Sequence, residues 1–201
     1  MNQPDRNTQS PRCELRRQQV LDAAAECFRH AGFHGASIAQ ISKTAGMSPG
    51  HLYYLFDSKE AIIAGIVERN LESSLEIISR LEAATDVLGD MLDGVVQALG
   101  EKSDPDRVGL WIEVLAEAAR NPEVARVVRE ADGKVRERIG HLAETARKSR
   151  GIEPRLDPDA VVEVLVGMFE GMANRIVQNP DRDNQAVAEV LRVAMTAVLE
   201  A

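Results

Sequence analysis

Apolar residues recur with a helical spacing along almost the whole chain, and no segment shows the sustained alternation of apolar and polar residues that a half-buried strand needs. A broad apolar stripe runs between residues 58 and 83, where isoleucine, leucine and valine return every three or four positions. The same spacing predicts a first helix that ends at Gly32 and further helices at residues 37–45, 48–55, 86–100, 105–120, 122–150, 157–178 and 184–200. We therefore expect an all-α fold of about nine helices.

Several of the predicted helices begin with the same pair, a capping side chain followed by proline. The side chain accepts a hydrogen bond from the first turn, and proline occupies the first helical position, where no amide partner is needed. The pair occurs at Ser48-Pro49, Asp104-Pro105, Asn121-Pro122 and Asp157-Pro158. Ser37 and Gln40 have the spacing of a capping box, which predicts another helix start.

The composition excludes several classes of protein. A chain of 201 residues with 44% hydrophobic and 28% charged residues is long enough to bury a core without disulfides or metals. No apolar run approaches the roughly 20 residues that span a bilayer, and the first 15 residues lack the apolar stretch of a signal peptide. Two cysteines do not make a disulfide framework. We expect a cytoplasmic protein with no membrane partner and no cofactor.

Charge and aromatic residues are distributed unevenly, although the net charge is −8. The first 60 residues carry 7 Lys and Arg against 6 Asp and Glu, whereas the remainder carries 17 against 26. Five of the aromatic residues also lie in the first 60 positions. The near-neutral first 60 residues and the acidic remainder of the chain (the body) therefore indicate two separate functions.

The segment 37–60 is the most informative part of the chain. It predicts two short helices around a tight turn, in which Gly46 permits the sharp bend of a helix-turn-helix. The outward residues of the second helix are polar, include little acid and suit a major groove. These residues are Ser48, Gly50, His51, Tyr53 and Tyr54.

Lys59 is poorly explained by the fold alone, because it lies in the first turn of a long helix, where the macrodipole disfavours a cation. A DNA phosphate placed there would satisfy both the lysine and the free amides. The alternative is a solvated lysine, whose cost is negligible. The neighbouring tyrosines and the turn favour the phosphate interpretation.

The segment resembles the TetR family of transcriptional regulators, whose pattern is T-IA--AGVS-G-LY-YF--KE. The match covers residues 16–68 and includes Ile38-Ala39, Ala45-Gly46, Ser48, Gly50, Leu52-Tyr53, Phe56 and Lys59-Glu60. The resemblance implies phosphate contacts from Ser37, Ser48, Tyr53, Tyr54 and Lys59, base contacts from Pro49, Gly50 and His51, and further contacts from Arg12, Arg16 and Arg17. Tyr54-Leu55 departs from the commoner pattern, which affects sequence preference rather than the fold.

The resemblance implies three parts: a flexible arm at 1–13, a DNA-binding domain at 14–58, and a ligand-binding and dimerisation domain at 59–201. Apolar residues surround most of the helix at 160–177, and the last helix adds a second apolar stripe, which predicts a four-helix interface with a symmetry mate. The candidate interface residues are Val161, Leu165, Val187, Leu191, Ala194, Met195 and Val198. The alternative is that both helices close the core of the monomer.

A pocket for a small-molecule effector is the second expectation for the body. Tryptophan, phenylalanine and methionine suit an adaptable apolar site, and a few polar groups would fix the ligand. The candidates are Met91, Trp111, Glu113, Leu115, Met168, Phe169, Met172, Asn174 and Arg175. The same residues at helical spacing are also typical of plain core.

No metal site or catalytic centre is predicted. Cys27, His30 and His34 could suggest zinc, but Gly32 ends the helix between the two histidines, and Cys27 fits as a small buried residue. No carboxylate pair accompanies a nucleophile or a Gly-rich phosphate loop, so we do not expect an enzyme.

These observations together predict a homodimeric transcriptional regulator, in particular a repressor. Its partners would be double-stranded DNA with a palindromic operator, a small-molecule effector and a second copy of the chain. One alternative is a DNA-organising or partner-binding protein of the same fold without effector control. Another is an enzyme or carrier built on the helical body.

Overall fold

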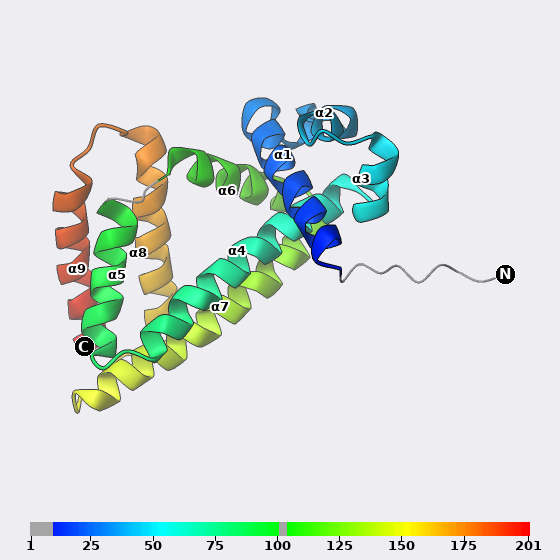
Figure 1. Cartoon of the computed structure of the whole chain (residues 1–201). Coiled ribbons are helices and arrows are strands. Elements are labelled where there is room, and N and C mark those ends of the chain that lie inside the picture. The colour runs from blue at the N-terminus through cyan, green and yellow to red at the C-terminus, as the bar shows by residue number, and fades with distance from the viewer. Residues whose placement is uncertain (1–9, 101–103) are drawn as a thin grey trace. The chain divides into compact units, whose positions relative to one another are not determined.

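The computed structural model describes residues 10–100 and 104–201, which form nine helices and no strand (Figure 1). The helices are α1 (Pro11–Gly35), α2 (Ile38–Thr44), α3 (Pro49–Leu55), α4 (Lys59–Glu82), α5 (Val87–Gly100), α6 (Pro105–Ala118), α7 (Pro122–Ser149), α8 (Pro158–Gln178) and α9 (Asn184–Glu200). The all-α prediction is confirmed, and each helix expected from the sequence has a counterpart.

The helix starts follow from their capping side chains. Asp157 accepts from the Ala160 amide at 2.9 Å, and Asn121 accepts from the Glu123 amide at 3.1 Å. The same device begins α1, where Ser10 accepts from the Cys13 amide and Pro11 occupies the first position. The predicted arm at 1–13 is therefore wrong for residues 11–13, which are helical, while residues 1–9 lie outside the described residues.

A kink interrupts α1 where the sequence predicts its end. Gly32 has φ 69° and ψ 169°, a conformation that glycine adopts without the steric cost of a side chain. The chain returns to helical geometry for one short turn, so α1 continues to Gly35. That turn leads directly into Ser37, which caps α2.

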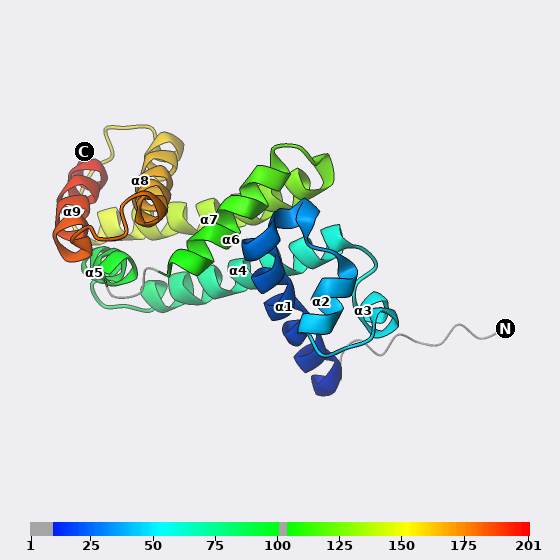
Figure 2. The ribbon, with the colours of Figure 1, turned by 90° about the horizontal axis from the view of Figure 1, so that it is seen from above.

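The first compact unit consists of the described residues up to Arg69 together with Leu110–Val128. Helices α1, α2 and α3 pack on one another (Figure 2). The most buried side chains of the unit, at most 1% exposed, include Phe28, Ile41 and Leu52 from these helices and Ile62 and Ile66 from α4. Burying each side chain of this size contributes about 1.5–3 kcal/mol, which fixes the short helices α2 and α3 that would not be stable alone.

The second compact unit consists of Asn70–Gly109 and Arg129–Ala201. Within it α5, α8 and α9 pack together, and α7 adds apolar side chains such as Leu142 to their common core (Figure 1). Arg147 is buried in this unit and donates from Nε to the Leu199 carbonyl at 2.8 Å.

The two units do not follow the expected boundary after residue 58. Three helices contribute residues to both units, because the divisions fall inside α4, α6 and α7.

Within the described ranges, no helix combines the length and the apolar character needed to cross a membrane.

Candidate nucleic-acid interface

The helix-turn-helix is held by local hydrogen bonds that its sequence dictates. Ser37 and Gln40 form the predicted capping box at the start of α2, with the Gln40 amide 3.2 Å from Ser37 Oγ and the Ser37 amide 2.8 Å from Gln40 Oε1. In the turn that follows, Gly46 adopts φ +64° and the Met47 amide bonds the Ser42 carbonyl at 2.8 Å. The bend between α2 and α3 therefore needs glycine at this position.

The two faces of α3 differ sharply in character. Leu52 and Leu55 point into the core and are 0% and 7% exposed, whereas Tyr53 and Tyr54 are 51% and 52% exposed. The remaining predicted contacts on this short helix and its cap are exposed as well, namely Ser48, Pro49, Gly50 and His51. The structure thus places together six of the predicted DNA contacts, on α3 and its cap.

Gly50 occupies an ordinary helical position with open space around it. A Cβ atom built on Gly50 would meet no atom within 4 Å, so internal packing does not require glycine there. Glycine in a helix is less stable than alanine by about 0.5–1 kcal/mol. The base contact expected of Gly50 stays a prediction.

The two capping serines have different hydrogen-bonding capacity left for a ligand. The Ser48 oxygen accepts from the His51 amide at 3.2 Å, and its hydroxyl hydrogen remains available to a phosphate. The Ser37 hydroxyl instead donates to Gln40 Oε1 at 2.9 Å. Ser48 is therefore the better placed phosphate donor of the pair.

Lys59 has an intramolecular role that the sequence analysis missed. Its ammonium donates to the Phe33 carbonyl at 2.6 Å and to the Ala36 carbonyl at 3.0 Å. Because these carbonyls lie at the end of α1, the cation occupies a favourable helix terminus although it begins α4. Neither the phosphate nor the solvated-lysine interpretation included these carbonyls, and the phosphate contact of Lys59 stays a prediction.

Arg17 is likewise engaged within the first unit. Its Nη1 donates to the Leu55 carbonyl at the end of α3 at 2.7 Å, and its guanidinium lies 4.3 Å from the centre of the Phe56 ring. Arg17 thereby contacts the end of α3, and its expected contact with DNA stays a prediction. Arg16 and Arg12 are exposed, and Arg16 donates to Gln19 on the same helix at 2.9 Å.

Cys27, His30 and His34 do not converge. Cys27 and His30 line a cleft of about 430 Å³ between α1 and α2, which Glu26 and Lys43 also border. His34 does not line this cleft, and its Nε2 lies 3.1 Å from a carboxylate oxygen of Glu117. Over the described residues, no three histidine, cysteine or acidic side chains are arranged to hold a metal ion.

The structure gathers part of the candidate effector set. Met168, Phe169 and Met172 pack against the core of the second unit, which contains Met91. Trp111, Glu113 and Leu115 belong to the first unit. Arg175 is exposed and donates to Gln178 on its own helix at 2.6 Å, while Asn174 is half-buried.

Glu113 lies against the kink of α1. One of its carboxylate oxygens would be 3.4 Å from a Cβ atom built on Gly32. This placement gives Glu113 a neighbour in the first unit that the effector prediction did not foresee. The pocket itself stays a prediction.

The predicted dimer interface is wrong for four of its residues. Val161, Leu165, Leu191 and Met195 are at most 5% exposed and belong to the core of their own chain. This outcome is the alternative in which α8 and α9 close the monomer core. Val187, Ala194 and Val198 are half-buried.

A different apolar stripe lies on the exposed face of α9. It consists of Ala186, Val190, Val193 and Ala197, all exposed, with Val190 at 71% and Val193 at 70%. Val164 on α8 is also exposed, at 48%. The spacing of four, three and four positions was visible in the sequence, but its hydrophobicity is weaker than that of the buried stripe.

Two family models match the chain. Residues 20–66 match the model for bacterial regulatory proteins of the tetR family, and residues 84–200 match the C-terminal domain of BetI-type transcriptional repressors. The chain belongs to the TetR family. It is a DNA-binding transcriptional regulator, and the helix-turn-helix described above lies within the first matched range.

Relatives with this family fold extend over almost the full length of the chain. The regulator UidR of Escherichia coli K12 is 28% identical over 189 residues, which cover 92% of this chain and 93% of UidR. Salmonella enterica GusR has a solved structure with a TM-score of 0.82, 25% identity, and coverage of 97% and 100% of the two chains. FadR of Bacillus subtilis, solved with stearoyl-CoA, has a TM-score of 0.78 at 17% identity and coverage of 90% and 98%, which shows a shared fold.

Proposed function

We propose that this TetR-family regulator is a homodimeric repressor that binds a palindromic operator through α3 and is released by a small molecule. The exposed face of α3 carries the proposal. The five exposed residues of α3 offer hydroxyl, imidazole and backbone groups without an acidic side chain. They are Pro49, Gly50, His51, Tyr53 and Tyr54. Such a face suits the donor and acceptor pattern of the major groove.

Base reading is assigned to Pro49, Gly50 and His51 at the start of α3, and phosphate contacts to Ser48, Tyr53 and Tyr54. The His51 and Tyr54 rings lie 6.2 Å apart between centres, so the imidazole is supported on one side by an aromatic neighbour. The first residues of a recognition helix are those that reach base edges in helix-turn-helix proteins. Arg12 and Arg16 would add contacts from α1.

Dimerisation is assigned to the exposed stripe on α9 together with Val164 on α8. Apolar side chains that lie in a row on an exposed face need a cover, and a symmetry mate supplies the same row in return. A two-fold axis then requires two half-sites about one helical turn of DNA apart, or a multiple of it.

Effector binding is assigned to the second unit, where Met168, Phe169 and Met172 are only partly buried beside the core. Methionine side chains adapt to irregular ligands. FadR of Bacillus subtilis, which shares this fold, was solved in complex with stearoyl-CoA, and this supports ligand binding by proteins of this fold. A ligand releases DNA only if it binds the two conformations unequally, and a coupling of about 1–3 kcal/mol is sufficient.

The decisive experiment is capture of genomic DNA fragments by the purified protein, followed by sequencing. Tyr53→Ala is the loss-of-binding variant, and Leu156→Ala, which removes a 49% exposed side chain far along the sequence, is the matched control. A few sharp peaks with a shared palindrome, lost only with Tyr53→Ala, are expected. A scattered profile would instead favour a DNA-organising protein of the same fold.

A further inference from the structure

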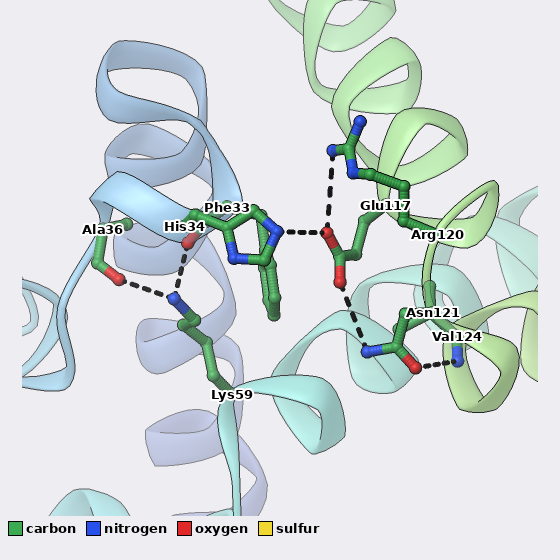
Figure 3. Close-up of polar contacts among 8 residues, drawn as sticks. All are labelled: Phe33, His34, Ala36, Lys59, Glu117, Arg120, Asn121 and Val124. Carbon is green, nitrogen blue, oxygen red and sulfur yellow. Dashed lines mark hydrogen bonds and ion pairs between the residues drawn. The ribbon is translucent and has the colours of Figure 1, made fainter.

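Glu117 is a buried charge near the end of α6, within the first unit. Its side chain is 3% exposed, and Oε1 accepts from Asn121 Nδ2 at 3.2 Å. Oε2 makes no well-aligned hydrogen bond among the described residues, and its nearest donors are His34 Nε2 at 3.1 Å and Arg120 Nη2 at 3.7 Å (Figure 3). A buried carboxylate is strongly destabilising when its partner is removed, and His34 is the nearer of the two partners of this oxygen.

The His34 contact is not part of the apolar core. The His34 side chain is 72% exposed and meets Glu117 at the edge of the unit. Only its ring edge touches the buried Phe33 ring, at 5.4 Å between centres. Substitution of His34 therefore removes the contact with Glu117 without opening a cavity.

The segment Phe33–Ala36 is held from two sides. Lys59 of α4 binds its backbone carbonyls, and Glu117 of α6 holds it through the His34 side chain (Figure 3). The segment has the Gly32 kink before it and Ser37, the capping residue of α2, after it. A displacement of these four residues would thus be passed to the start of the helix-turn-helix.

Helix α6 is continuous, although its residues divide between the two units. Pro105–Gly109 belong to the second unit, and the remainder, which includes Glu117, belongs to the first. Two charged side chains of this second part lie against the end of α1, Glu113 beside the Gly32 kink and Glu117 beside His34.

We propose that Glu117 is a positioning residue for DNA recognition, which acts through His34 to fix the segment that leads into α2. The proposal rests on the operator binding proposed above. Operator affinity then depends on the pair of side chains, although neither residue belongs to α3. If His34 instead contacted phosphate directly, its loss would weaken DNA binding independently of Glu117.

A double-mutant cycle separates these two roles. The full-length variants His34→Gln, Glu117→Gln and the double variant would be titrated with operator DNA recovered from the genomic capture. Each single change is expected to weaken binding by about two- to thirty-fold, the range found for residues that couple sites, and the double variant no further. Additive losses, or unchanged affinity in either single variant, would overturn the proposal.

The matched control is His30→Gln. His30 is another exposed histidine on α1, one turn earlier, and it faces the cleft between α1 and α2. Its operator affinity is expected to equal that of the wild type. A loss as large as that of His34→Gln would show that the effect comes from any change on this surface of α1.

Hydrogen exchange tests the positioning step without DNA. In His34→Gln and in Glu117→Gln, amides of Ile38–Thr44 are expected to exchange faster, while the rate in the core of the second unit is unchanged. Unchanged exchange in α2 would contradict the proposal even if DNA binding fell. Should the wild type bind no specific DNA, the proposed function fails, and the exchange result alone then decides whether Glu117 positions α2.

Discussion

The ammonium of Lys59 lies 4.3 Å from the centre of the Phe33 ring and binds the carbonyls of Phe33 and Ala36. A residue that begins α4 thereby completes the end of α1. Arg17 has the same relationship to α3, where it lies over Phe56 and binds the Leu55 carbonyl. Each cation compensates the partial negative charge of the carbonyls at a helix C-terminus, where the macrodipole favours positive charge.

Lys59→Met is expected to destabilise the protein by about 1–2 kcal/mol, because it removes two hydrogen bonds from a charged donor. Urea denaturation would measure the loss. The salt dependence of operator affinity is expected to remain that of the wild type, since both hydrogen bonds that are lost lie within the chain. A slope reduced by about one, with full stability, would restore the phosphate role.

Gly50→Ala is expected to separate folding from DNA binding. The added methyl group has open space within the chain, so stability is expected to stay equal or rise by up to about 0.5–1 kcal/mol. Against DNA the same methyl group would overpack the contact and weaken operator binding by about 1–3 kcal/mol. Wild-type affinity in this variant would show that no surface approaches Gly50 closely.

His51→Ala is expected to relax the base preference at one operator position by about 1–3 kcal/mol, because the imidazole faces the base edges in the proposed complex. Binding to a panel of operators substituted at each position would measure this change. Affinity for random DNA is expected to remain that of the wild type. An equal loss on the operator and on random DNA would assign His51 to the phosphate backbone instead.

Val193→Glu is expected to produce monomers, since it places a charge in the exposed stripe of α9 that we assign to the dimer. Sedimentation velocity would report the oligomeric state, and operator affinity is expected to fall with it. Leu156→Glu, at a position of 49% exposure outside the stripe, is the control and should remain dimeric. A Val193→Glu protein that stays dimeric would place the interface elsewhere.

Glu170→Gln is expected to stabilise the protein at pH 7. Partial loss of solvent first, and then the neighbouring charges of Asp132 and Glu163, raise the pKa of Glu170, although the residue remains exposed at one side. Because the folded state holds this proton more tightly than the unfolded state, the stability it contributes is present below the unfolded pKa and is lost as pH rises through the folded pKa. Thermal melting should show the variant above the wild type at pH 7 and equal to it below about pH 4, where both side chains are neutral. Equal melting temperatures at pH 7 would contradict this.

The helices and the reading face are matters of local sequence. Ser37 and Ser48 begin α2 and α3 because a cap and its partner amide lie within three residues of each other. The turn between α2 and α3 has a positive φ at position 46, which glycine adopts readily, so this residue also follows from the local sequence. The period of 3.6 residues then decides which side chains of α3 turn away from the core, so the exposed Tyr53 and Tyr54 were predictable.

Contacts between distant segments could not be inferred in this way. Lys59 and Phe33 are 26 positions apart, and nothing in either segment shows that α4 begins where α1 ends. The sequence therefore offered a phosphate as the partner of the lysine, while the tertiary structure supplied two carbonyls. His34 and Glu117 were missed for the same reason, because only the fold brings the end of α1 to α6.

The sequence by itself determined the helices, the capped helix-turn-helix and the family. It did not determine which of the two apolar stripes on α9 faces inward, since hydrophobicity records only that a side chain avoids water and not what covers it. Tertiary packing decided that Leu191 and Met195 belong to the core and left Val190 and Val193 exposed. It also decided that Lys59 and Arg17 bind the carbonyls at the ends of α1 and α3. A charge is paired by whichever group the fold brings within hydrogen-bonding distance.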